Sequence, residues 1–257
     1  MVDKKKEEIF RKIQEALQNI PDNYSILEEQ VDLELQLKYF KFSKKVKENL
    51  DKEDILTHIN DLFNPEIEQE KKKRLMVSLA SIDSIEAFRA LEKYVNEGEE
   101  SLHKWAVLAF QESRMLIETS LLGEQQMFIS TGLGGKGNLL RYFAVIIGKE
   151  DREFSTTEKN LIKDELEFAL GHHDSFLEEI DFHYGYVSTL TMIPIRQPIK
   201  EIFDSTIQEC NQLGDFLYDE VILTNVKVFN DQEITDMISA KRKEETDPSE
   251  DDSEVKN

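Results

Sequence analysis

The sequence predicts two structural classes in one chain, an α-helical N-terminal half followed by an α+β half. Apolar residues recur at helical spacing as far as residue 122, and beyond it they alternate or run together as they do in strands. A glycine cluster lies between two strand-like runs just after this change. We therefore expect a helical domain over 1–122, an α+β domain over 123–240 and a disordered acidic tail over 241–257.

Composition and charge narrow the choice of partner. The chain has 257 residues with 32 basic and 53 acidic side chains, which gives a net charge of -21. Such a charge disfavours anionic membranes and long duplex nucleic acid as partners. The N-terminus lacks the apolar core of a signal peptide, and the single cysteine, Cys210, excludes an internal disulfide. We expect a soluble cytoplasmic protein that binds no membrane.

The N-terminal half begins with three predicted helices, because apolar residues recur there every three or four positions. Their expected ranges are 4–20, 25–45 and 51–63. In the second of them the expected inward-facing residues are Ile26, Leu33, Leu37 and Phe40.

Further helices are predicted over the rest of this half, ending at Gly123. Within residues 70–122, the stretch 79–113 (LASIDSIEAFRALEKYVNEGEESLHKWAVLAFQES) resembles a HEAT-type helical repeat. In such repeats two antiparallel helices pair across a short turn, and small residues such as Ala106 and Ala109 allow close stacking. The resemblance implies a stacked helical surface used for binding, and an ordinary helical bundle is the alternative.

A glycine-rich segment separates the two halves, and its residues are Gly132, Gly134, Gly135, Lys136, Gly137 and Asn138. Three of these glycines fit the spacing G-x-G-x-x-G, which in dinucleotide-binding folds precedes a helix that holds a pyrophosphate. Here a strand-like run over 139–147 follows instead. We interpret the segment as a hairpin, and the alternative is an anion-binding loop in which Lys136 and Asn138 assist the backbone amides.

The second half alternates strand-like and helix-like segments from Leu139 onward. A capping box at Ser155 and Glu158 opens a helix that ends at Gly171. If 180–195 contains two strands rather than one bent at Gly185, the order is the ferredoxin-like βαββαβ arrangement. The sequence therefore predicts an α+β sandwich with an additional strand near Met127.

Candidate metal ligands are His172, His173 and His183, since imidazoles close in sequence can share a metal ion. His172 and His173 are adjacent, however, so their side chains diverge in regular structure. No nucleophile motif is present, and Cys210 lies on the apolar stripe of its predicted helix. We predict no cofactor.

The leading functional prediction is a non-catalytic adaptor that binds another protein through its helical surface. The α+β domain would supply a second binding or dimerisation surface, so a homodimer is also expected. One alternative is a small-ligand or nucleotide-binding regulator that uses Gly132, Gly134, Gly135, Lys136, Gly137 and Asn138. Another is a metal-dependent enzyme that uses His172, His173 and His183.

Overall fold

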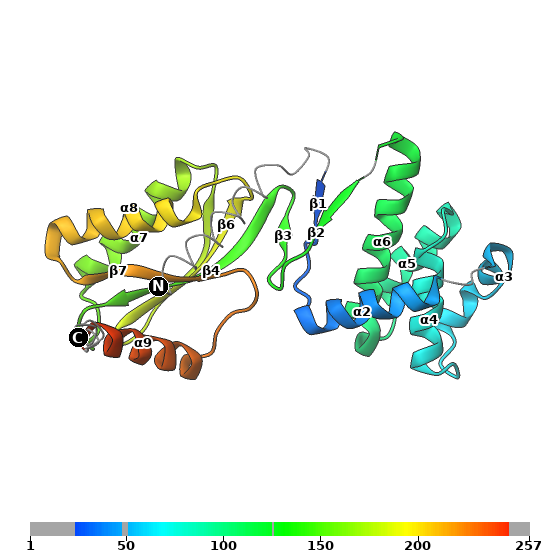
Figure 1. Ribbon diagram of the computed structural model, residues 1–257, viewed down its shortest axis with the longest axis horizontal. Helices are drawn as coiled ribbons and strands as arrows, with labels where there is room; N and C mark the ends of the chain where they lie inside the picture. Colours follow the sequence, from blue (N-terminus) through cyan, green and yellow to red (C-terminus); the bar gives the residue numbers. More distant parts are fainter. Residues whose placement is uncertain (1–23, 48–50, 125, 247–257) are drawn as a thin grey trace, which may run out of the picture. The chain divides into compact units, whose positions relative to one another are not determined.

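A computed structural model describes residues 24–47, 51–124 and 126–246, so the helix predicted over 4–20 lies outside the described residues. The N-terminal helices precede a curled antiparallel sheet, which confirms the predicted multidomain α and α+β class (Figure 1). The chain divides into two compact units. The helical unit comprises residues 1–141 with 192–197, and the α+β unit comprises residues 142–191 with 198–257.

The elements of the helical unit before the glycine-rich segment are mostly helices (Figure 1). In chain order they are β1 (Tyr24–Ile26), α2 (Leu33–Val46), α3 (Lys52–Thr57), η1 (Ile59–Phe63), α4 (Gln69–Ala80), α5 (Ile85–Glu97), η2 (Glu100–Leu102), α6 (His103–Leu122) and β2 (Met127–Ile129). Helix α6 packs against both α4 and α5. Ala106 and Ala109 are fully buried, and their small side chains let the helices approach closely.

The single tryptophan, Trp105, lies in the core of this unit. Its ring meets the rings of Tyr39 and Phe42 edge-on, with centroids 5.1 and 5.5 Å apart, so α2 is anchored to α6 by aromatic contacts.

The helix predicted over 25–45 is wrong at its N-terminal end, because α2 begins only at Leu33. Residues Tyr24–Ile26 form β1 instead and pair in parallel with β2, with Ser25 opposite Phe128. The Asp32 carboxylate then caps α2 by accepting hydrogen bonds from the amides of Glu34 and Leu35. The strand partner lies far away in the sequence, so local spacing gave no sign of it.

The remaining elements build one sheet with helices. They are β3 (Gly135–Lys136), β4 (Leu139–Gly148), α7 (Thr156–Gly171), β5 (Phe176–Phe182), β6 (Tyr186–Pro194), α8 (Ile199–Gly214), β7 (Leu217–Thr224) and α9 (Asp231–Thr246). The strand order is β3-β4-β6-β5, and β7 also pairs antiparallel with β4, with Phe143 opposite Thr224. The segment predicted over 180–195 is two strands, and Gly185 lies in the turn between them at φ +80°.

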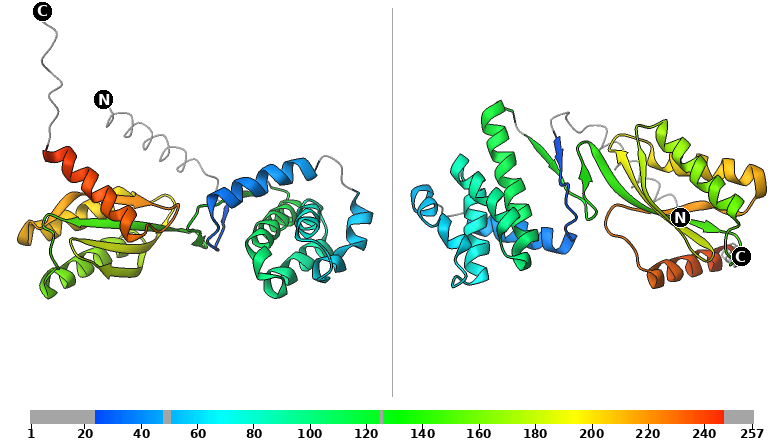
Figure 2. Two further views of the ribbon diagram at one scale, coloured as in Figure 1. Left: turned by 90° about the horizontal axis from the view of Figure 1, so that it is seen from below. Right: turned by 180° about the vertical axis from the view of Figure 1, so that it is seen from behind.

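Helices α7 and α8 pack together on one face of the α+β unit's sheet, and α9 lies on the other face (Figures 1 and 2). The capping box predicted at Ser155 and Glu158 is confirmed and opens α7. Within the described residues, no helix combines the length and apolar character that crossing a membrane requires.

The prediction of a disordered tail places its start, residue 241, too early, because α9 continues to Thr246. Two basic residues explain the extension. Lys241 forms an ion pair with Glu220, and Arg242 pairs with Asp151 at 2.6 Å. These contacts hold the last turns of α9 on the α+β unit, although the sequence there has almost no apolar residue.

Candidate functional site

Helix α2 packs Leu35, Tyr39, Phe42 and Val46 against the core, but it also buries two polar residues and leaves two large apolar ones exposed. Its buried positions are Gln36, Tyr39, Ser43 and Val46. Leu37 and Phe40, predicted to face inward, are instead 58% and 47% exposed. Buried polar residues and exposed large apolar ones both depart from the usual distribution of side chains between core and surface.

Hydrogen bonds explain how Gln36, Tyr39 and Ser43 of α2 can be buried. The Gln36 amide donates to the carbonyl oxygens of Val31 at 2.8 Å and Thr131 at 3.2 Å. The Tyr39 hydroxyl donates to the Glu112 carboxylate on α6 at 2.5 Å, and Ser43 donates to the same carboxylate at 3.3 Å. Each buried polar group on this side has a partner, so burial costs little free energy.

The Glu112 carboxylate ties α2 to α6. Besides Tyr39 and Ser43 it binds Lys47, the residue that follows α2. Burial, and then the charge of Glu112, raise the pKa of Tyr39 well above its ordinary value of 10.0. The phenol therefore stays a neutral donor at physiological pH, and the contact fixes the rotation of α2 about its axis.

Phe40, one of the two exposed apolar residues of α2, borders a groove. One wall comes from α2 through Phe40, Ser43, Lys44 and Lys47, and the facing wall comes from α6 through Leu108, Gln111, Glu112 and Met115. The floor is Phe128 of β2, and this part of the groove holds about 320 Å³. A second hollow of about 780 Å³ shares Phe40, Met115 and Phe128 with the first and continues along β2 over Met127–Ile129.

The spacing of the two walls shows why the groove forms. Phe40, Lys44 and Lys47 are three or four residues apart, so they lie on one side of α2. Leu108, Gln111, Glu112 and Met115 have the same spacing on α6. The walls supply apolar contact and a few polar groups, a composition that suits the binding of an apolar chain segment.

The glycine-rich segment lies elsewhere in the helical unit and forms the β3–β4 hairpin. Lys136 pairs with Leu139, so Gly137 and Asn138 make the turn, and the strand-like prediction for 139–147 is confirmed by β4. A Cβ atom on Gly134 would lie 2.7 Å from the carbonyl oxygen of Glu28, and one on Gly135 would lie 2.2 Å from that of Leu139. Close backbone packing accounts for these two glycines without a ligand.

Gly132, Gly134 and Gly135 are buried, whereas Lys136, Gly137 and Asn138 are exposed at the hairpin tip. No helix N-terminus follows the glycines, because residues Leu139–Gly148 are the strand β4. The amides that would cradle a phosphate in a dinucleotide fold are therefore not aimed by a helix here.

Two of the three candidate histidines, His172 and His183, have separate local partners for their side chains. The His172 Nδ1 atom lies 2.9 Å from the Phe168 carbonyl oxygen at the end of α7. The His183 Nε2 atom lies 3.0 Å from the Ser188 hydroxyl, and its ring stacks on Tyr186 with centroids 4.5 Å apart. Among the described residues no group of three or more histidine, cysteine, aspartate or glutamate side chains could hold a metal ion.

His183 and Ser188 border a small cavity of about 190 Å³ between the sheet and α9. Three carboxylates also line it, from Glu179, Asp181 and Asp231. Such an acidic lining opposes the negative charge that develops in acyl transfer, so a serine–histidine hydrolase site is disfavoured.

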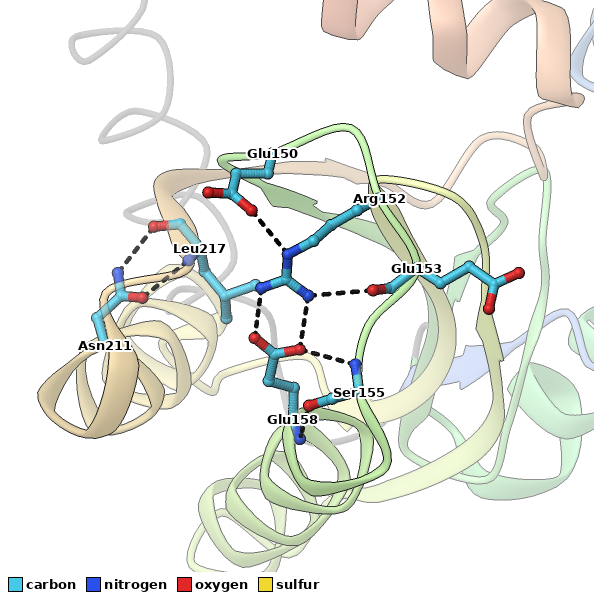
Figure 3. Close-up of polar contacts among 7 residues, drawn as sticks. All are labelled: Glu150, Arg152, Glu153, Ser155, Glu158, Asn211 and Leu217. Carbon is cyan, nitrogen blue, oxygen red and sulfur yellow. Dashed lines mark hydrogen bonds and ion pairs between the residues drawn. The ribbon is translucent and has the colours of Figure 1, made fainter.

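A cluster of charged groups at the start of α7 is fully occupied by its own contacts (Figure 3). Arg152 grips the Glu158 carboxylate with two bonds of 2.8 and 2.6 Å and also donates to Glu150 at 2.8 Å. The Arg152 guanidinium, followed by the hydrogen bonds at Ser155, lowers the pKa of Glu158 from 4.5 to about 2. The cluster caps α7, and the Arg152 guanidinium is already paired within it, so the cluster stabilises the fold.

Cys210, the single cysteine, is fully buried on α8. Burial, and then the charges of Glu165 and Glu209, raise its pKa to about 12. The thiol is therefore protonated and unreactive, in agreement with the apolar position that the sequence predicts.

Comparison with known proteins gives little information about the groove. The chain matches no protein-family profile and no curated protein. It is similar to a solved structure of a putative transposase from Deinococcus radiodurans R1, with 14% identity and a TM-score of 0.35, over 40% of this chain and 91% of that chain.

A second similar structure is a C-terminal segment of the alpha subunit of aIF2 from Pyrococcus abyssi. Its identity is 13% and its TM-score 0.23, over 76% of this chain and 98% of that chain. Both TM-scores are below 0.5, so neither likeness supports a conclusion about this chain.

Proposed function

We propose that this chain is a non-catalytic adaptor that binds a segment of another protein in the groove between α2 and α6. One observation supports this most strongly: α2 buries Gln36 and Ser43 and leaves Phe40 exposed on the wall of the groove, with Leu37 exposed one turn away. Moving a leucine or phenylalanine side chain fully out of water contributes roughly 1.5–3 kcal/mol. Phe40 is 47% exposed, so burial of its remaining surface by a partner supplies part of this free energy.

The rigidity of the groove supports the same proposal. Glu112 holds Tyr39 and Ser43 of α2, and Trp105 packs on Tyr39, so α2 and α6 are fixed to each other before any partner arrives. A preformed groove avoids the ordering cost that weakens flexible binding surfaces.

We infer that the α+β unit is a ferredoxin-like sandwich. It is the proposed second binding surface. The element order β4-α7-β5-β6-α8-β7 supports this inference. Strand β5 lies at the end of the strand order, where it can accept another strand. Its Glu178, Glu179 and Asp181 would repel those of a second copy, which favours a different protein over a homodimer at this edge.

A cytoplasmic location belongs to this proposal as well. It rests on the single cysteine of the chain, Cys210, which is buried, and on the net charge of -21.

The direct test compares Phe40→Asp with Ile85→Asp. Ile85 is 68% exposed in the first turn of α5, in the same unit but outside the residues that line the groove, so it controls for the added charge. Partners would be captured on the full chain from the cells that express it, identified, purified and titrated against each variant. We expect Phe40→Asp to weaken binding at least about 30-fold, which corresponds to ~2 kcal/mol.

Ile85→Asp should bind as tightly as the unsubstituted chain. If Phe40→Asp binds equally well while thermal unfolding shows it to be folded, the groove is not the binding site and the proposal fails.

A further inference from the structure

Helix α2 carries a concentration of positive charge in an acidic protein. Five lysines fall between residues 38 and 47, namely Lys38, Lys41, Lys44, Lys45 and Lys47, although the chain as a whole has a net charge of -21. All five are exposed, and Glu34 is the only acidic residue within α2. The apolar face of the groove is therefore bordered by cations.

From this arrangement we infer that the groove selects an acidic amphipathic segment of the partner, with an apolar residue and a carboxylate one helical turn apart. The inference rests on the proposed adaptor function and adds the chemistry of the partner. The apolar residue contacts Phe40, Met115 and Phe128, and the carboxylate lies beside Lys44.

The two lysines that line the groove differ in what they can still bind. Lys47 is paired with Glu112, which also accepts hydrogen bonds from Tyr39 and Ser43. Within the described residues Lys44 forms no ion pair. A carboxylate from outside would therefore meet Lys44 as an uncompensated cation.

The spacing of the recognition elements follows from helix geometry. Phe40 and Lys44 are four residues apart, which places them about 6 Å apart along the axis of α2. A helical ligand lying along the groove presents side chains at the same spacing when its apolar and acidic residues are three or four positions apart. This separation distinguishes the proposed ligand from a segment that is only hydrophobic.

Two other anionic occupants fit less well. A membrane surface is broad, whereas Leu108 and Met115 lie inside a groove between two helices, and the net charge of -21 opposes approach to an anionic bilayer. The acidic C-terminal sequence of a second copy, residues 247–257, contains Val255 as its single aliphatic residue. Asp251 and Asp252 stand four and three positions before Val255. Valine, however, offers less apolar contact to Phe40 and Met115 than a larger side chain.

The test selects ligands without assuming the partner's identity. A displayed library of random peptides of about four helical turns, or roughly 15 residues, is panned against the full chain, with Phe40→Asp as the counter-target. The best binder is then titrated against Lys44→Glu and Lys45→Glu. These two variants change the charge equally in the last turn of α2, but only Lys44 lines the groove.

We expect binders that depend on Phe40 to be enriched in carboxylates three or four positions from an apolar residue. Lys44→Glu should weaken the best binder about 5-fold or more, the scale of an exposed ion pair, and Lys45→Glu should weaken it less than about 2-fold.

Enrichment of neutral or basic binders that still depend on Phe40 would overturn this inference and leave the adaptor function standing. A library that yields no binder dependent on Phe40 would instead contradict both. Vesicles of phosphatidylserine and phosphatidylcholine provide the last arm, because sedimentation with them that is lost in Lys44→Glu would assign the lysines to a membrane and overturn the inference.

Discussion

Helices α2 and α8 are two long helices of this chain with apolar residues at helical spacing, but they differ in which of their side chains are buried. Helix α8 buries Ile202, Phe203, Ile207 and Cys210, so its apolar stripe faces the sheet as the spacing predicts. Helix α2 buries Gln36 and Ser43 beside Tyr39 and Val46, while Leu37 and Phe40 stay exposed. The difference separates a helix whose buried face is almost wholly apolar from one that buries polar residues and leaves large apolar ones in contact with water.

The contrast shows which interaction decides the orientation of a helix. On α8 the gain from apolar burial dominates, and its buried polar hydroxyl, that of Thr206, donates to its own helix at Ile202. Asn211 adds two hydrogen bonds with the backbone of Leu217. On α2 the Glu112 carboxylate offers acceptors to Tyr39 and Ser43, and Trp105 offers an aromatic surface to Tyr39. Together these contacts outweigh the exposure of Leu37 and Phe40.

The largest expected effect compares one phenylalanine from each helix. Phe203→Ala on α8 should lower the free energy of unfolding by about 3–5 kcal/mol, because it leaves a cavity in a fully buried position. Phe40→Ala on α2 should change it by no more than about 0.5 kcal/mol, because the side chain is already half in water.

Denaturant titrations followed by circular dichroism measure the first variant, and fluorescence of the single tryptophan, Trp105, reports on the helical unit for the second. Equal losses of stability in the two variants would remove the distinction between the helices.

A smaller expected effect is the pH dependence of stability that Glu158 of α7 contributes. The folded pKa of Glu158 is about 2 against an ordinary 4.5, so the carboxylate binds fewer protons in the folded state. Its stabilisation is therefore fully present above about pH 4.5 and is lost as the pH falls toward 2. Because its partner Arg152 is partly exposed, we expect Glu158→Gln to cost only about 1 kcal/mol near neutral pH.

The difference between Glu158→Gln and the unsubstituted chain should shrink below pH 4.5 and vanish near pH 2. Glu167→Gln on the same helix is the control, since the pairing of Glu167 with Lys163 at 3.8 Å is loose and half exposed. A difference that stays constant across this pH range would mean that Glu158 acts through its shape and not through its charge.

Much of the α+β unit could be predicted because its signals are local. The Ser155–Glu158 capping box lies within one turn, and the order of strands and helices after Leu139 follows from spacing and from turn glycines such as Gly185. The hairpin at Gly137 and Asn138 is local as well, whereas the contact of Gly134 with Glu28 is not, so the reason for that glycine became visible only in the structure.

The groove could not be predicted, because its walls and floor come from three separate parts of the sequence. Phe40, Met115 and Phe128 meet through the packing of α2 on α6 and the pairing of β1 with β2. One sign was present in the sequence: Gln36, Tyr39 and Ser43 share one side of a helix with the spacing of a buried stripe. Because polar residues rarely form a core, the spacing rule favours the more hydrophobic side of the helix instead.

The rotation of α2 is the claim on which the binding groove depends, and thiol labelling tests it most directly. Cys210 is buried, so the unsubstituted chain provides a low background, and Phe40→Cys and Ser43→Cys place one thiol at an exposed and one at a buried position of α2. The structure predicts that Phe40→Cys, at a half-exposed position, is labelled readily and that Ser43→Cys, at a buried position, is strongly protected. If Ser43→Cys reacts as fast as Phe40→Cys, or if the protection is reversed, α2 does not present Leu37 and Phe40 to a partner.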